Sequence, residues 1–222
     1  IDGYIHKLKY NTWDLYKYKV DDTSKIGKGE YCCSIKTDEL AFGDANIHME
    51  HSVLENPYGG LIVFSSENLN TVAANTIDEK HARIKFIDID NNGDYTITSE
   101  IKSTLMFTGI HSGSGYYVID QYLYFIPIAN YTSTTATTYT GTGISSSLYR
   151  LDMKNHTLEK LVTISSAIFT TATDFYAHKL IVDNGKAYII DPKTSAYSNV
   201  YVYDLVTKTG SLIDNHLLPC YL

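Results

Sequence analysis

One pattern that recurs three times along the chain constrains the fold more than any other feature. In each copy, an alternating run of apolar and polar residues leads to an aspartate, an apolar residue, a polar turn and a second alternating run. The copies span residues 84–97, 148–158 and 200–212. Alternation with a period of two is typical of a half-buried strand, and Asn92-Gly93 in the first copy is a strong hairpin signal. The sequence therefore predicts a repeated β-hairpin.

Further elements complete the repeat. A weaker copy at residues 4–18 has Lys9 where the other copies have their aspartate. A turn and a short apolar strand precede each strong copy, and such continuous apolar strands are typical of a buried inner position. These strands span residues 58–64, 120–126 and 183–190. Each unit then has about four strands: a first strand, an apolar inner strand and an outer hairpin. The outer hairpins are expected near residues 4–18, 84–100, 147–164 and 199–214.

The spacing of the copies predicts propeller blades with insertions. Asp88 and Asp152 are about 64 residues apart, and Asp152 and Asp204 about 52, against roughly 40–50 in propeller blades. Two long connections, residues 132–143 and about 21–56, account for the excess. We expect one all-β domain over residues 1–222: a β-propeller of four-stranded antiparallel blades, as an incomplete or a four-bladed ring. A β-sandwich built from the same hairpins is the alternative.

The copies resemble the blades of kelch-like and related β-propellers, in which a tyrosine-rich strand ends in aspartate before a Lys/Asn/Thr turn. Residues 200–204, followed by Thr207-Lys208-Thr209, carry the resemblance best. Gly59-Gly60 is similar to the double glycine of kelch repeats, and Trp13 to the tryptophan after the turn, but each appears in one copy only. The resemblance implies the architecture and no particular activity.

Composition and charge exclude several classes of protein. The 222 residues include 20 Tyr, which favours strands, and carry a net charge of -7, which argues against a nucleic-acid-binding surface. No apolar run approaches the roughly 18 residues of a membrane span. The three cysteines form neither a closed disulfide framework nor a CxxC metal motif. The chain starts at Ile1 and ends in the apolar run 217–222, so we expect a processed chain or part of a larger one.

One polar loop resembles a calcium-binding loop. Asp88, Asp90, Asn92 and Asp94 place oxygen atoms at alternate positions, and Gly93 stands at the sixth position, as in an EF-hand. The twelfth position, however, is Ser99, and the flanks alternate as strands. Two interpretations stay open: a hairpin with a polar tip and no cofactor, or a weak Ca²⁺ site. His48 and His51 have the spacing of metal ligands on a helix, but no further ligand is identifiable.

A second loop is the candidate binding site. Residues 130–147 are rich in Thr, Ser and Tyr and contain no charged residue. Tyrosine rings with flexible hydroxyl partners suit recognition of proteins and sugars, so Tyr131, Thr138, Tyr139 and Thr140 are the predicted binding residues. No catalytic residue is predicted, because the nucleophile and phosphate-binding motifs are missing.

Two functions are compatible with these features. The first is a non-catalytic propeller that binds protein or glycan through its loops, as a module of a larger extracellular, cell-surface or phage virion (tail) protein or assembly. The alternative is a carbohydrate-active propeller enzyme with its site at the central opening. Convergence of acidic residues there, such as Asp120, Asp183 and Asp191, would distinguish the enzyme.

Overall fold

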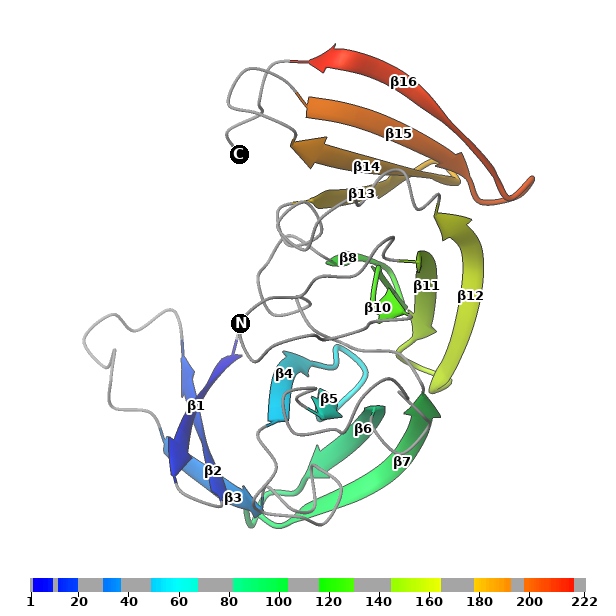
Figure 1. The fold of residues 1–222 in the computed structure, drawn as a ribbon. Helices are drawn as coiled ribbons and strands as arrows, with labels where there is room; N and C mark the ends of the chain where they lie inside the picture. Colours follow the sequence, from blue (N-terminus) through cyan, green and yellow to red (C-terminus); the bar gives the residue numbers. More distant parts are fainter. Residues whose placement is uncertain are drawn as a thin grey trace.

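The chain folds into four antiparallel β-sheets that follow one another along an open arc (Figure 1). The computed structural model describes residues 2–9, 12–19, 30–36, 49–67, 82–103, 116–129, 145–164, 178–192 and 198–217, and all the regular structure in them is β-strand. The all-β propeller of antiparallel blades expected from the repeat is therefore present, and its arc is open between the first and last sheets. No helix long and apolar enough to span a membrane occurs in these ranges.

Sheets 2 and 4 each have four strands in chain order from the inside of the arc outwards. Sheet 2 consists of β4 (Met49–Glu55), β5 (Leu61–Glu67), β6 (Ala82–Ile89) and β7 (Tyr95–Ser103). Sheet 4 consists of β13 (Lys179–Asp183), β14 (Lys186–Pro192), β15 (Ser198–Asp204) and β16 (Thr209–Leu217).

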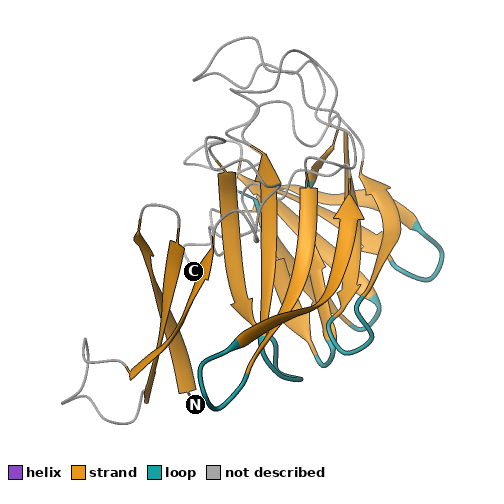
Figure 2. Cartoon of the chain, turned by 90° about the horizontal axis from the view of Figure 1, so that it is seen from below, coloured by secondary structure: helices purple, strands orange, loops and turns teal. Residues whose placement is uncertain are grey.

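Sheet 3 has the same four-stranded order with one extension. It consists of β8 (Tyr116–Ile119), β9 (Tyr122–Phe125), β11 (Ser145–Asp152) and β12 (Thr157–Ile164). The two-residue β10 (Ile128–Ala129) also pairs with β11 and prolongs the ladder that β9 begins. The described turns of sheets 2 to 4 lie at one end of the sheets, which we call the tight-turn end (Figure 2).

Sheet 1 has three strands, β1 (Asp2–Lys9), β2 (Thr12–Lys19) and β3 (Glu30–Lys36). The hairpin at residues 4–18 is thus β1–β2, and the stretch 21–56, expected to be a connection, contains β3 and β4. Propensity alone did not mark these two strands, because they contain residues such as Lys36, Glu50 and His51 in place of a clear apolar alternation.

A one-residue bulge gives a structural alignment of the sheets. The register of the outer hairpin shifts directly after Phe86 in β6, Leu148 in β11 and Val200 in β15. Sheet 1 has the same shift after Leu15, between β2 and β3. The hairpin β2–β3 therefore corresponds to the outer hairpins, and β1 corresponds to β5, β9 and β14. The expectation that residues 4–18 form an outer hairpin was wrong, and Lys19 rather than Lys9 stands where the other sheets have their aspartate.

Three apolar cores join consecutive sheets. We call the face toward the next sheet in the chain the forward face, and the opposite one the backward face. In β5, Leu61 and Val63 pack backward on sheet 1, whereas Ile62 and Phe64 pack forward on sheet 3. All four are buried, which explains the continuous apolar run, because a strand between two sheets has no solvent face. Burying one such side chain stabilises the fold by about 1.5–3 kcal/mol.

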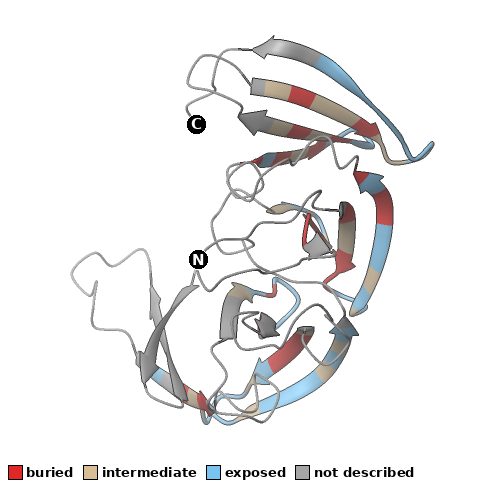
Figure 3. Ribbon diagram, in the orientation of Figure 1, coloured by how far each residue is buried: buried red, intermediate tan, exposed pale blue. Residues whose placement is uncertain are grey.

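The same alternation continues along the arc. Leu123 and Phe125 of β9 pack backward against sheet 2, and Tyr124 and Ile126 pack forward against sheet 4. Exposed residues lie along the outer strands β7, β12 and β16 (Figure 3). The order of the cores follows the order of the sheets, as in a stack of blades and unlike a two-sheet sandwich.

Candidate functional site

The predicted binding loop leaves the sheets at the end opposite the tight turns, because it joins β10 to β11. Tyr131, Thr138, Tyr139 and Thr140 lie outside the described residues, so the binding assignment stays a prediction. Its two flanks are described. Ile128 pairs with Ser146 and Ala129 with Ser145, in antiparallel register. Both ends of the loop are therefore held by one sheet.

The aspartate of the repeat stabilises its own turn. Oδ1 of Asp152 accepts hydrogen bonds from the backbone N–H groups of Lys154 and Asn155 at 3.0 and 2.9 Å. Oδ1 of Asp204 accepts the same pair from Val206 and Thr207, both at 2.9 Å. These carboxylates take up the N–H groups that a tight turn leaves unpaired.

In sheet 2 this role belongs to Asp90, not to Asp88 as the sequence pattern suggested. Oδ1 of Asp90 accepts backbone N–H groups from Asn92 at 2.8 Å and Asp94 at 2.9 Å. Asp90 also lies four residues after the last residue before the bulge, as do Asp152 and Asp204. The alternating run 84–90 contains both Asp88 and Asp90, and the pattern alone allows either of them to be the aspartate of the repeat. Only the position of the bulge distinguishes them.

The predicted calcium ligands Asp88, Asp90, Asn92 and Asp94 lie in and beside the β6–β7 turn. The turn is a five-residue loop with Gly93 at φ 85°, rather than a two-residue Asn-Gly hairpin. Asp90 Oδ2 accepts a further hydrogen bond from the Asn92 side-chain amide at 3.3 Å. Within the described ranges no three His, Cys, Asp or Glu side chains gather as metal ligands. Calcium binding therefore stays a prediction, which calorimetric titration of the wild type and Asp94→Ala would test.

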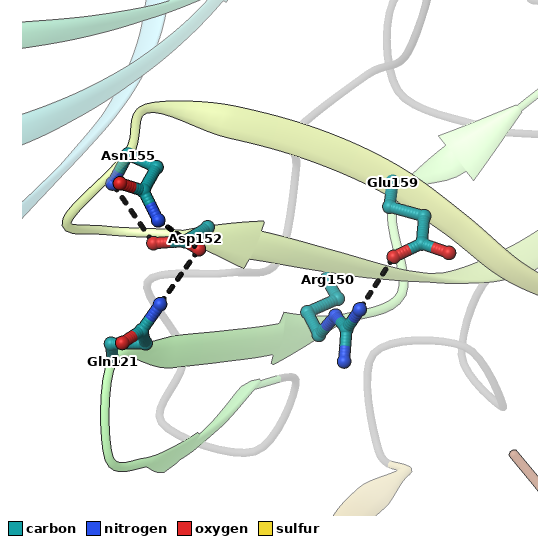
Figure 4. A network of polar contacts seen from close by, with 5 residues as sticks. All are labelled: Gln121, Arg150, Asp152, Asn155 and Glu159. Carbon is teal, nitrogen blue, oxygen red and sulfur yellow. Dashed lines mark hydrogen bonds and ion pairs between the residues drawn. The ribbon is translucent and has the colours of Figure 1, made fainter.

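Asp152 is the centre of a polar network at the tight-turn end of sheet 3 (Figure 4). Its Oδ2 accepts the side-chain amides of Gln121 at 2.8 Å and Asn155 at 2.9 Å. Burial alone would raise the pKa of Asp152, but the hydrogen bonds from Asn155, Gln121 and Lys154 outweigh it and hold the pKa below its usual value. The carboxylate thus stays charged and ties the β8–β9 turn to the β11–β12 turn.

The pKa values of the other two turn aspartates, Asp90 and Asp204, are also lowered by hydrogen bonds within their turns. The backbone N–H of Asp94 is the main cause that lowers the pKa of Asp90, and that of Thr207 the main cause for Asp204. All three resolved shifts among the described carboxyl groups therefore have local, structural causes. A reactive acid or base is instead tuned by a cleft and by neighbouring titratable groups.

The acidic residues considered for the enzyme alternative are Asp120, Asp183 and Asp191. Asp120 is exposed in the β8–β9 turn with φ 52°, and Asp183 is exposed at the end of β13. Asp183 Oδ2 accepts the side-chain amide of Asn184 at 2.9 Å. The side chain of Asp191 lies outside the described residues. The structure therefore shows no convergence of the first two with a third acid in its described part.

Three interactions were not predicted from the sequence. Arg150 of β11 pairs with Glu159 of β12 at 2.6 Å (Figure 4), and its guanidinium lies 4.5 Å from the ring centroid of Tyr122. The hairpin register, which places Arg150 opposite Glu159, would have indicated the first contact. His156 stacks on Phe86 of sheet 2, with ring centroids 3.7 Å apart and an angle of 13°. That contact joins two sheets and leaves no pattern in the sequence.

Comparisons with known proteins give weak structural matches only. No protein-family model matches the chain, and no curated protein matches its sequence. A solved structure of puromycin hydrolase is 13% identical with a TM-score of 0.40, over 98% of this chain and 28% of that chain. TolB from Acinetobacter baumannii is 11% identical with a TM-score of 0.24, over 96% of this chain and 68% of that one. Both have propeller-type folds, and neither match supports the kelch-like family or a function. The chain thus spans about a quarter of the puromycin hydrolase chain.

Proposed function

We propose that the chain is a rigid, non-catalytic β-propeller module that binds a protein or glycan through the connections opposite its tight turns. One observation carries the proposal. Among the described residues, the three carboxyl groups with lowered pKa values, those of Asp90, Asp152 and Asp204, direct their oxygens to donors in their own turns or in the turn beside them. The perturbed acids therefore stabilise a scaffold.

The flanks of the Thr/Ser/Tyr-rich loop support its role as the binding site. The β10–β11 pairing holds both ends of residues 130–144 on sheet 3. The forward face of that sheet is fixed by the apolar core shared with sheet 4. A loop on such a base loses less entropy on binding than one between mobile segments. Uncharged residues with many hydroxyl groups suit sugar hydroxyls and peptide amides as partners.

The setting we propose is a larger extracellular, cell-surface or virion protein, such as a phage tail component. The abundance of Tyr, Thr, Ser and Asn and the acidic net charge of -7 support a role at surfaces and not on nucleic acid. Host-surface glycans and other proteins of the same particle are the partners that fit this setting.

A glycan array probed with the purified chain tests the proposal. We expect binding that Tyr131→Ala/Tyr139→Ala removes and that Tyr58→Ala leaves intact. Tyr58 is the matched control, because it is 49% exposed in the β4–β5 turn at the opposite end. Equal loss in both variants would contradict the loop assignment.

A hydrolysis assay on bound glycans separates the module from the enzyme alternative. We expect no release of reducing sugar by the wild type. Release that Asp120→Asn or Asp183→Asn abolishes would overturn the non-catalytic proposal and place the site at the inner strands of sheets 3 and 4.

A further inference from the structure

The forward face of sheet 4 is apolar and only partly covered. The bulge alignment places one isoleucine at the same register position in three sheets. Ile62 lies opposite Phe86 and Ile190 opposite Val200, while Ile126 follows the β9 residue that pairs with Tyr149. Ile62 and Ile126 are 0% and 1% exposed, under the next sheet, whereas Ile190 is only partly buried. Ile181, Tyr188 and Val202, paired on the same face of sheet 4, are also partly buried.

The outer strands β12 and β16 differ in the exposure of their bulge residues more than the inner strands do. The bulge residue is Leu161 in β12 and Ile213 in β16. Leu161 is 6% exposed and belongs to the core between sheets 3 and 4, whereas Ile213 is 58% exposed. The bulge residue of β7, Thr98, is exposed although sheet 3 follows it. The position of the bulge residue therefore does not by itself bury its side chain. The polar Thr98 stays in solvent at this position, whereas the apolar Leu161 is covered by the neighbouring sheet.

Sheet 1 lies at the other end of the arc (Figure 1). Every described core joins the forward face of one sheet to the backward face of the next. At the backward-face positions directly after the bulge, sheet 3 has Tyr149 and Leu151, and sheet 4 has Tyr201 and Tyr203. The same register positions of sheet 1 hold Tyr16 and Tyr18. The first sheet thus has at these positions the residue types that cover a forward face elsewhere.

We propose that the forward face of sheet 4 binds the backward face of sheet 1 of a second copy of this chain. The contact continues the interface that already joins sheets 1 to 2, 2 to 3 and 3 to 4. A second, reciprocal contact closes two arcs into a ring of eight sheets, the upper end of the usual propeller range of about four to eight. Two patches that are complementary to each other form a closed ring when the rotation permits and an open chain when it does not.

Light scattering after size-exclusion chromatography tests the proposal on the 222-residue chain. We expect the mass of two chains at about 100 µM protein, at an ionic strength of about 0.15 M where repulsion between the acidic copies is screened beyond about 8 Å. Ile213→Lys is expected to raise the dissociation constant at least about tenfold, because an unpaired ammonium would enter an apolar contact. Because Ile213 is exposed in the single chain, the variant keeps the folded β-sheet circular dichroism signal.

Leu212→Lys is the matched control. Leu212 is 47% exposed and occupies the register position at which β12 has Lys160, an exposed residue. A lysine at this position is therefore compatible with a covered sheet, and we expect Leu212→Lys to keep the dimer. A monomeric wild type, or a dimer that Ile213→Lys leaves unchanged, would overturn the proposal. An open-ended series of larger species would overturn the closed ring.

Discussion

Asp152→Asn is expected to lower the free energy of unfolding by about 2 kcal/mol. The amide keeps one oxygen for the backbone N–H groups of Lys154 and Asn155, but it puts an NH₂ group where Oδ2 accepts the amides of Gln121 and Asn155. Two charge-assisted hydrogen bonds are lost, each contributing about 1.5–3 kcal/mol. The side-chain amides of Gln121 and Asn155 lie near solvent and form replacement hydrogen bonds with water. The net loss of stability is therefore about 2 kcal/mol.

Urea unfolding followed by circular dichroism measures this change. With a slope of about 2.5 kcal/mol/M, the midpoint should fall by about 0.8 M. Asp204→Asn is the control, because Asp204 makes the same two backbone contacts through one oxygen and the amide can keep both. We expect a much smaller shift for it. Equal shifts in the two variants would refute the role given to the Gln121 and Asn155 amides.

The pH dependence of the urea midpoint, compared between the wild type and Asp152→Asn, gives an independent check. The pKa of Asp152 is lowered in the folded chain from its ordinary 3.8. The stability that its carboxylate contributes is therefore fully present above the ordinary pKa and is lost as pH falls through the lower folded value. The difference in midpoint between wild type and Asp152→Asn should be constant near neutral pH and shrink below 3.8. A difference that grows on acidification would contradict this sign.

Two further predictions concern backbone conformation in the turns, both measured as shifts of the urea midpoint. Gly60→Ala should destabilise by about 3 kcal/mol, because Gly60 has φ +71° and a Cβ there would collide with the Ile87 carbonyl oxygen. Gly185→Ala, at φ +72° in open space, should cost only about 1 kcal/mol, and equal costs would disprove the collision. Lys208→Gly should stabilise by about 0.5 kcal/mol, because Lys208 is exposed at φ 57°, a conformation that glycine adopts without strain. Lys208→Ala should give no gain, and a gain as large as that of glycine would contradict the conformational explanation.

The repeat was predictable from the sequence because strand alternation and turn residues are local. The Leu180–Tyr188 hairpin illustrates this: Asn184 and Gly185 have φ 47° and 72°, the left-handed conformations that an Asn-Gly turn requires. The short apolar runs were also informative, since β5 packs on both of its faces. By contrast, β3 and β4 were missed: β4 has polar residues at both odd and even positions, and in β3 the adjacent Cys32 and Cys33 interrupt the alternation.

Contacts between the sheets were not predictable in the same way. Asn56 is 6% exposed in the β4–β5 turn, and its side-chain amide donates to the backbone oxygen of Met153 in the next sheet at 3.2 Å. Nothing in the sequence relates two turns that are 97 residues apart. The site prediction had the same limit, since composition could single out residues 130–147 but could not say which residues meet in space.

The bulge connects the local strand pattern with the contacts between sheets. It is a local feature of the backbone, and it decides which residues meet across sheets. A one-residue change of register moves every later side chain of a strand to the other face. The extra residue is Leu161 of β12: before it Leu158 packs backward, whereas after it Val162 and Ile164 pack forward. The same shift in β2 gives sheet 1 its place in the alignment although Lys19 replaces the aspartate. The repeat is therefore defined more reliably by the position of its bulge than by its aspartate, and the partly covered face of sheet 4 is recognised only in that alignment.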